Sequence, residues 1–114
     1  MSGWIGVDLD GTLAEYHGWV NGGTIGEPIP KMVARVKAWL ARGIDVRVFT
    51  ARVAVPQAGV HRTIEDWCVK HIGQALPITA TKDYGMIELW DDRAIQVVSN
   101  TGDRADGRTE GTAT

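Results

Sequence analysis

Pairs of carboxylates stand at two places where an apolar stretch of the chain ends. Asp8 and Asp10 close the stretch WIGVDLD, and the adjacent Asp91 and Asp92 follow the stretch MIELW. Side chains two residues apart on a strand share one face, and carboxylates held that close repel each other unless a cation or a shared proton intervenes. Carboxylate oxygens suit a hard metal such as Mg²⁺. The pattern indicates a metal site; the alternative is solvated strand ends, with Arg93 as counter-charge to the second pair.

Groups that could accompany such a site occur beside these acids. Gly11 allows a sharp turn after Asp10, and Thr12 adds a hydroxyl. Thr50 ends a second apolar stretch, IDVRVFT, and Arg52 follows it closely. Thr50 is either part of the site or a simple cap or turn residue, and Arg52 is either a ligand-binding cation or a surface charge.

The elements that must position these residues alternate between strand and helix. Residues 4–9 read as a short buried strand, residues 30–42 as an amphipathic helix that starts at a proline and ends before Gly43, and residues 44–50 as a strand. A strand, a helix and a second strand form a right-handed crossover unit, so the sheet should be parallel. Open parallel sheets bind ligands at their C-terminal edge, where Asp8 and Thr50 would meet.

The second half of the chain predicts further elements. Thr63 is the expected N-cap of a helix over residues 64–72, and residues 77–80 give a weak strand. Residues 86–90 predict a fourth strand and residues 95–98 a fifth one, at the edge of the sheet. From Asn100 onward almost no residue is apolar, so we expect a flexible tail over residues 100–114 after a domain over residues 1–99.

Residues 14–27 predict a small hairpin or flap between the first strand and the first helix. The segment is rich in glycine, and Asn21-Gly22 is a strong signal for a tight turn. Tyr16, His17 and Trp19 lie on it. These side chains would either cover the edge of the core or contact a substrate.

Bulk composition limits the class of protein. The chain has 114 residues, enough for one domain, and 44% of them are hydrophobic. Its net charge of -2 provides no global attraction to nucleic acid or to an anionic membrane. Cys68 is the only cysteine, which excludes an internal disulfide and favours a role as a small core residue. No apolar run reaches membrane-spanning length, and we expect a cytoplasmic protein without a membrane partner.

Taken together, the motifs resemble those of the haloacid dehalogenase-like superfamily of phosphohydrolases. The resemblance spans about residues 4–99 and has four motifs in the family's order. They are Asp8-Leu9-Asp10-Gly11-Thr12, then Thr50, then Lys82, then Asp91-Asp92.

The resemblance implies a Mg²⁺-dependent phosphomonoester hydrolase that forms an aspartyl-phosphate. Asp8 would be the nucleophile and a metal ligand, and Asp10 the general acid and base, with its backbone carbonyl on the metal. Thr50 and Lys82 would hold the phosphoryl group, with Gly11, Thr12, Ala51 and Arg52 also binding the substrate. Asp91 would bind Mg²⁺, and Asp92 would assist directly or through water.

The resemblance also implies the architecture. We expect a single Rossmann-like α/β domain of three layers, with a mostly parallel sheet, a small flap hairpin and no cap domain. The gaps between the motifs are too short for the cap domains of many relatives. A capless enzyme must exclude water in another way, by a large substrate or by a partner subunit in a homo-oligomer.

The substrate and one competing class of function stay open at this level. The stretch DDRAIQVV and the Thr-Ala-Arg after the second strand are similar to the phosphatase half of polynucleotide kinase/phosphatase enzymes, so a nucleotide or a polynucleotide 3′-phosphate is a candidate substrate. The acidic net charge counts against nucleic acid. The alternatives are a receiver-like phospho-acceptor module, in which the acid pair comes first in the chain, and an inactive phospho-ligand binding protein on the same fold.

Overall fold

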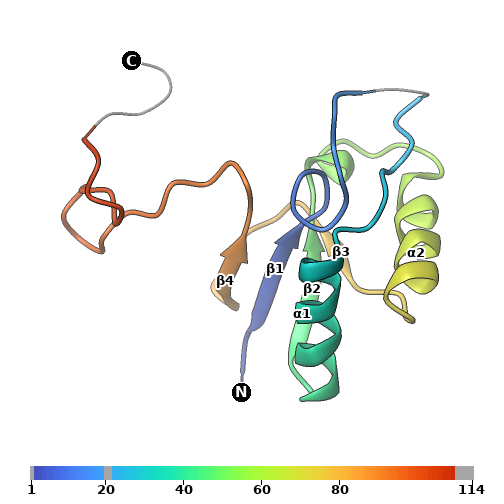
Figure 1. The fold of residues 1–114 in the computed structure, drawn as a ribbon, viewed down its shortest axis with the longest axis horizontal. Coiled ribbons are helices and arrows are strands. Elements are labelled where there is room, and N and C mark those ends of the chain that lie inside the picture. Colours follow the sequence, from blue (N-terminus) through green and yellow to red (C-terminus); the bar gives the residue numbers. More distant parts are fainter. Residues whose placement is uncertain (1, 20–21, 110–114) are drawn as a thin grey trace.

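Four parallel strands form the centre of the fold. The computed structural model describes residues 2–19 and 22–109. The strands are β1 (Trp4–Asp8), β2 (Asp45–Phe49), β3 (Ile78–Thr79) and β4 (Met86–Trp90), in the spatial order β3-β2-β1-β4 (Figure 1). This arrangement confirms the predicted small α/β, Rossmann-like fold. It also makes β1 an inner strand, with β2 on one side and β4 on the other.

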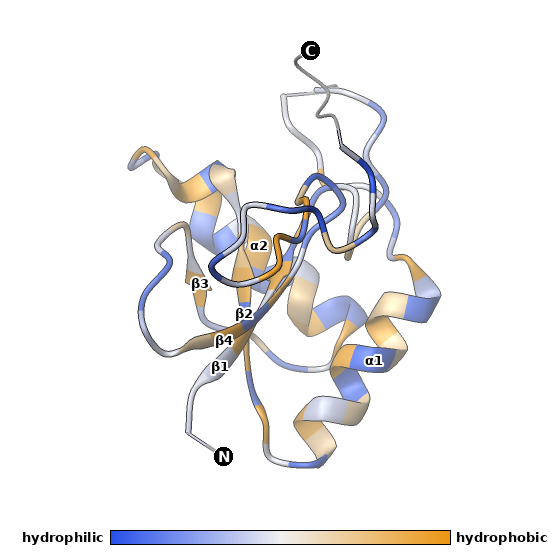
Figure 2. Ribbon diagram, turned by 90° about the vertical axis from the view of Figure 1, so that its left-hand side faces the viewer, coloured by the Kyte–Doolittle hydropathy of each residue, from blue (hydrophilic) through white to orange (hydrophobic). Residues whose placement is uncertain are grey.

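Two helices cover one face of this sheet. α1 (Pro30–Ala41) connects β1 to β2, and α2 (Val60–His71) connects β2 to β3. Both mix hydrophobic and hydrophilic residues along their turns, as an amphipathic helix requires (Figure 2). Their apolar sides share one core with the strands, and its buried members include Ile5, Val7, Val36, Val46, Val48, Ile64 and Cys68. Burial in this core raises the pKa of the Cys68 thiol to about 11, so Cys68 is a structural residue.

The start of α2 differs from the sequence prediction. The helix begins at Val60, after Gly59 in a left-handed conformation with φ of 82°. Thr63 is therefore wrong as the N-cap; its Oγ1 donates to the Gly59 carbonyl oxygen at 2.9 Å from within the first turn. The glycine makes the sharp entry that a capping side chain would otherwise stabilise.

The opposite face of the sheet has no helix among the described residues, so the predicted third layer is not formed there. The chain crosses from β3 to β4 in residues 80–85 alone, which is too short for a helix. Asp83 anchors this crossing because its Oδ1 accepts from Trp4 Nε1 at 2.9 Å. The Arg47 guanidinium lies 4.6 Å from the centre of the Trp4 ring, and Trp4 is 2% exposed.

Residues 95–98 do not form the predicted fifth strand. They pair instead with residues that follow them: Val98 N donates to the Asp103 carbonyl oxygen, and Ala105 N donates to the Gln96 carbonyl oxygen, both at 2.9 Å. Beyond β4 this segment extends away from the sheet (Figure 1). Of the predicted flexible tail, residues 100–109 include these contacts, and residues 110–114 lie outside the described residues.

The segment between β1 and α1 is closed at its base like a hairpin. Ala14 and Pro28 form an antiparallel bridge, and Glu15 N donates to the Glu27 carbonyl oxygen at 2.8 Å. The predicted Asn21-Gly22 turn includes Asn21, which lies outside the described residues. Within the described part of the chain, neither helix has the length and apolar character needed to cross a membrane.

Candidate active site

A tight turn at the C-terminal end of β1 places Asp8 and Asp10. The strand itself is buried, and the backbone N–H groups of Leu13 and Ala14 both donate to the Leu9 carbonyl oxygen. Gly11 adopts φ of 93°, and a Cβ atom at this position would lie 2.5 Å from Oδ2 of Asp92. The turn therefore brings the β1 end against the end of β4, and only glycine fits at the contact.

Three carboxylates gather where β1 and β4 end side by side. One oxygen from each of Asp8, Asp91 and Asp92 lies within 4.8 Å of the others. Thr12 links them: Asp92 N donates to its Oγ1 at 3.0 Å, and this hydroxyl lies 3.5 Å from Asp8 Oδ2 and 3.4 Å from Asp92 Oδ1. Parallel pairing of β1 with β4 explains the cluster, because it aligns the carboxyl ends of both strands.

The electrostatics of this cluster favour a bound cation. Burial raises the pKa of Asp8 to about 7, with further contributions from the charges of Asp91, Asp92 and Asp10. Arg93 does not act as the counter-charge to the acid pair: its backbone N–H donates to Asp91 Oδ1 at 2.8 Å, and no ion pair joins its guanidinium to the described residues. Three oxygen donors that form no ion pair with a cation of the described residues fit a divalent ion such as Mg²⁺.

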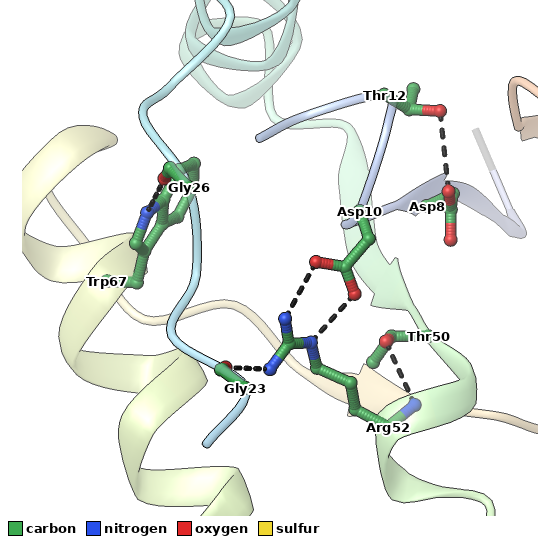
Figure 3. Close-up of polar contacts among 8 residues, drawn as sticks. All are labelled: Asp8, Asp10, Thr12, Gly23, Gly26, Thr50, Arg52 and Trp67. Carbon is green, nitrogen blue, oxygen red and sulfur yellow. Dashed lines mark hydrogen bonds and ion pairs between the residues drawn. The ribbon is translucent and has the colours of Figure 1, made fainter. Parts of the chain in front are cut away.

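Asp10 points away from this cluster and pairs with Arg52. Arg52 Nε lies 2.7 Å from Asp10 Oδ2, and Nη2 lies 2.8 Å from Oδ1, so the contact is bidentate (Figure 3). Arg52 Nη1 also donates to the carbonyl oxygen of Gly23. Only 9% of the Arg52 side chain and 19% of the Asp10 side chain are exposed. Arg52 is thus an internal cation, and the prediction of a surface charge is excluded.

Thr50 combines the two roles that its sequence context left open. It is 2% exposed, and its Oγ1 accepts from Arg52 N at 3.1 Å, which caps the short 3₁₀ turn η1 (Ala51–Val53). Its side chain also lines the same cavity as Asp8. The cap leaves the hydroxyl hydrogen available to donate into that cavity.

We call this cavity the aspartate cavity; its volume is about 410 Å³. Six of the residues that the sequence singled out line it: Asp8, Asp10, Thr50, Ala51, Arg52 and Asp92. Two aromatic residues of the segment before α1, Tyr16 and Trp19, also line the cavity; the sequence left their role open. Three further lining residues were not predicted as site residues: Val55, Gln57 and Arg93. Only the position of Arg93 next to an acid pair signalled a role; Val55 and Gln57 lie in a loop without any motif.

Four predicted site residues lie outside the lining of the aspartate cavity. Lys82 is in the crossing between β3 and β4, where it is exposed and makes no hydrogen bond or ion pair with a described residue. Gly11, Thr12 and Asp91 line a shallower hollow next to α1, on the other side of Asp92. The arrangement thus brings together the acids and Thr50, and leaves Lys82 apart.

Comparison with known proteins supports the fold. No family model and no curated protein matches the chain. The solved structure of a conserved protein from Bacteroides thetaiotaomicron is similar to it, with a TM-score of 0.58 and 21% sequence identity. The similarity covers 82% of this chain and 78% of that one. At this level of identity the likeness concerns the fold alone.

Proposed function

We propose that this chain is a Mg²⁺-dependent phosphomonoester hydrolase of the haloacid dehalogenase-like type, acting through an aspartyl-phosphate. The observation that carries the proposal is that the first two acids lie in different environments. Asp8 lies in a desolvated carboxylate cluster suited to a cation, whereas Asp10, two residues later, is held by Arg52 outside that cluster. Both acids line one cavity with Thr50.

In the first step, a carboxylate oxygen of Asp8 attacks the phosphorus atom. The bond between phosphorus and the ester oxygen breaks, and Asp10 gives its proton to the departing alkoxide. Thr50 donates its hydroxyl hydrogen to a phosphoryl oxygen. The family resemblance assigns Lys82 to the same charge, which requires its flexible side chain to reach the cavity from the crossing segment.

In the second step, water releases the phosphate. Asp10, now ionised, takes a proton from a water molecule whose oxygen attacks phosphorus, and the bond between phosphorus and Asp8 breaks. Inorganic phosphate leaves, and both aspartates return to their starting states. Arg52 holds the ionised Asp10 by both oxygens. In the protonated form Asp10 keeps one of these contacts, and its O–H faces the ester oxygen.

Asp8, Asp91 and Asp92 would hold Mg²⁺, with the Asp10 backbone carbonyl as a further ligand. When bound, the ion offsets the negative charge of the carboxylates and of the phosphoryl oxygens. The single buried cysteine is consistent with a reducing, cytoplasmic setting.

Turnover of 4-nitrophenyl phosphate with Mg²⁺ tests this proposal. We expect turnover that is lost on exhaustive chelation, and a phosphorylated Asp8 peptide after acid quench. Asp8→Asn should abolish both, whereas Asp45→Asn, an exposed acid at the start of β2, should retain both. Phosphorylation of Asp8 without catalytic turnover would indicate a receiver-like module, and binding of phosphate without either would indicate an inactive binding protein.

A further inference from the structure

A second cavity adjoins the aspartate cavity. It lies between the segment that precedes α1 and the start of α2, and its volume is about 420 Å³. Trp19, Arg52 and Gln57 line both cavities. We call it the α2 cavity; the remaining described residues of its wall are Gly22, Gly23, Ala58, Gly59, Val60 and Thr63.

The position of Arg52 relates the α2 cavity to the reacting atoms. Its guanidinium holds Asp10 on one side and the Gly23 carbonyl oxygen, on the wall of the α2 cavity, on the other. In the proposed reaction, Asp10 protonates the ester oxygen of the substrate. The group attached to that oxygen therefore departs from a position beside Asp10 and Arg52, at the boundary of the α2 cavity.

The chemistry of the wall selects an uncharged, ring-bearing group. Trp19 is 64% exposed, and the Arg52 guanidinium lies 4.8 Å from the centre of its ring. Gln57 offers an amide that both donates and accepts hydrogen bonds. Among the described wall residues there is no carboxylate, and the one cation, Arg52, is engaged by Asp10 and Gly23. An exposed aromatic side chain next to an amide suits a flat heterocycle with polar edges.

We propose that the α2 cavity binds the leaving alcohol of the substrate, and that this alcohol is a nucleoside. Trp19 stacks on the ring, and Gln57 bonds its polar edge. The volume is in the range of small-molecule sites, and a polynucleotide would need several free cations along its phosphates. This inference rests on the proposed function and specifies its substrate class as a mononucleotide.

Competition between two esters tests the inference. We expect kcat/KM for adenosine 5′-monophosphate to exceed that for glycerol 3-phosphate by about tenfold or more, since stacking on an aromatic side chain contributes strongly to binding of a base. Trp19→Ala and Gln57→Ala should each reduce this ratio, and Trp19→Phe should restore most of it. Tyr84→Ala is the matched control, because Tyr84 is a fully exposed aromatic residue on the crossing segment. It should leave the ratio unchanged.

Saturation-transfer NMR with adenosine provides a readout that needs no turnover. Adenosine should receive signal from the wild-type chain and from Tyr84→Ala, and lose it with Trp19→Ala. Hydrolysis of both esters at equal kcat/KM, without adenosine contact, would overturn the inference and leave the proposed function intact. A higher kcat/KM for a 3′-phosphorylated oligonucleotide than for the mononucleotide would also overturn it. Absence of hydrolysis for every ester would instead overturn the proposed function, and the leaving-group role with it.

Discussion

Arg52 clamps Asp10 with two parallel hydrogen bonds, of 2.7 and 2.8 Å, across 42 positions of the sequence. A bidentate guanidinium fixes both the place and the plane of a carboxylate, which a lysine at the same position would not do. The clamp ties the turn after β1 to the turn after β2. It therefore serves the fold and the proposed acid–base residue at once.

A double-mutant cycle should measure this clamp. Asp10→Asn leaves the guanidinium of Arg52 in a largely buried site without its counter-charge. Loss of one partner from a buried pair costs about 3–5 kcal/mol, and the partial exposure of Asp10 should bring the loss to the lower end of that range. Arg52→Gln should cost a similar amount, and the double variant less than the sum, in the free energy of urea-induced unfolding. Additive losses would show that the pair contributes no coupling energy.

Stability in the absence of metal should depend on pH through Asp8. Its pKa rises from 3.8 to about 7 on folding, so the folded state binds this proton more tightly than the unfolded state. The contribution of Asp8 to stability is therefore complete below about pH 4 and is lost as pH rises through about 7. We therefore expect the Tm of wild type to fall relative to that of Asp8→Asn as the pH rises from about 4 to about 7.

Mg²⁺ should reverse that shift, because a cation replaces the proton as the partner of the cluster. The increase in Tm on adding Mg²⁺ should be larger at pH 8 than at pH 5, and it should vanish in Asp91→Asn with Asp92→Asn. Asp103→Asn, in the segment beyond β4, is the control and should keep the increase. An equal increase in Tm for wild type and the double variant would show that Mg²⁺ does not bind at this cluster.

Gly11 should be sensitive to a single methyl group. Gly11→Ala places a Cβ atom against the carboxylate of Asp92, at φ of 93°. Gly43→Ala is the matched control, because Gly43 has φ of 76° but open space around its Cβ position. Both variants incur left-handed strain of about 1–2 kcal/mol, and overpacking should add about 1–3 kcal/mol for Gly11 alone. Urea unfolding measures this difference, and equal losses would show that Asp92 moves aside freely.

Asp10→Asn should separate leaving groups by their basicity. The variant cannot give a proton to the ester oxygen, so the first-step rate should fall strongly for an alkyl phosphate, whose leaving oxygen is strongly basic. The fall should be smaller for 4-nitrophenyl phosphate, whose leaving group departs without help. Rapid-quench burst measurements isolate this step from hydrolysis of the intermediate. An equal fall for both substrates would withdraw the acid–base role of Asp10.

The sequence was sufficient for the parts of the fold that local patterns encode. Apolar residues predicted β1, β2 and β4, and the right-handed crossover rule predicted the parallel pairing of β1 with β2. Because parallel strands end at one edge, the meeting of Asp8 with Thr50 also followed from the sequence, whereas that of Asp8 with Asp91 was implied by the family resemblance.

Features that depend on contacts between distant residues, or on backbone conformation, could not be predicted from the sequence. Residues 95–98 have the composition of a strand, but the Arg93 backbone N–H turns back onto Asp91 after β4, and the segment then pairs with the residues that follow it. The α2 start depends on the left-handed backbone of Gly59, which no side chain marks. The pairing of Arg52 with Asp10 joins two loops, and a local sequence pattern does not indicate which carboxylate an arginine will pair with.

The central place of β1 has a consequence for the order in which the chain assembles. The first residue of β1, Trp4, pairs with Asp45 of β2 on one side and with Met86 of β4 on the other. One edge of β1 is therefore paired only after β4, the last strand in the sequence, has docked. Contacts so distant in sequence close slowly. Docking of β4 also brings Asp91 and Asp92 against Asp8, so charge repulsion opposes this docking. A divalent cation, or acid, should therefore accelerate the docking of β4, which completes the sheet and the acid cluster together.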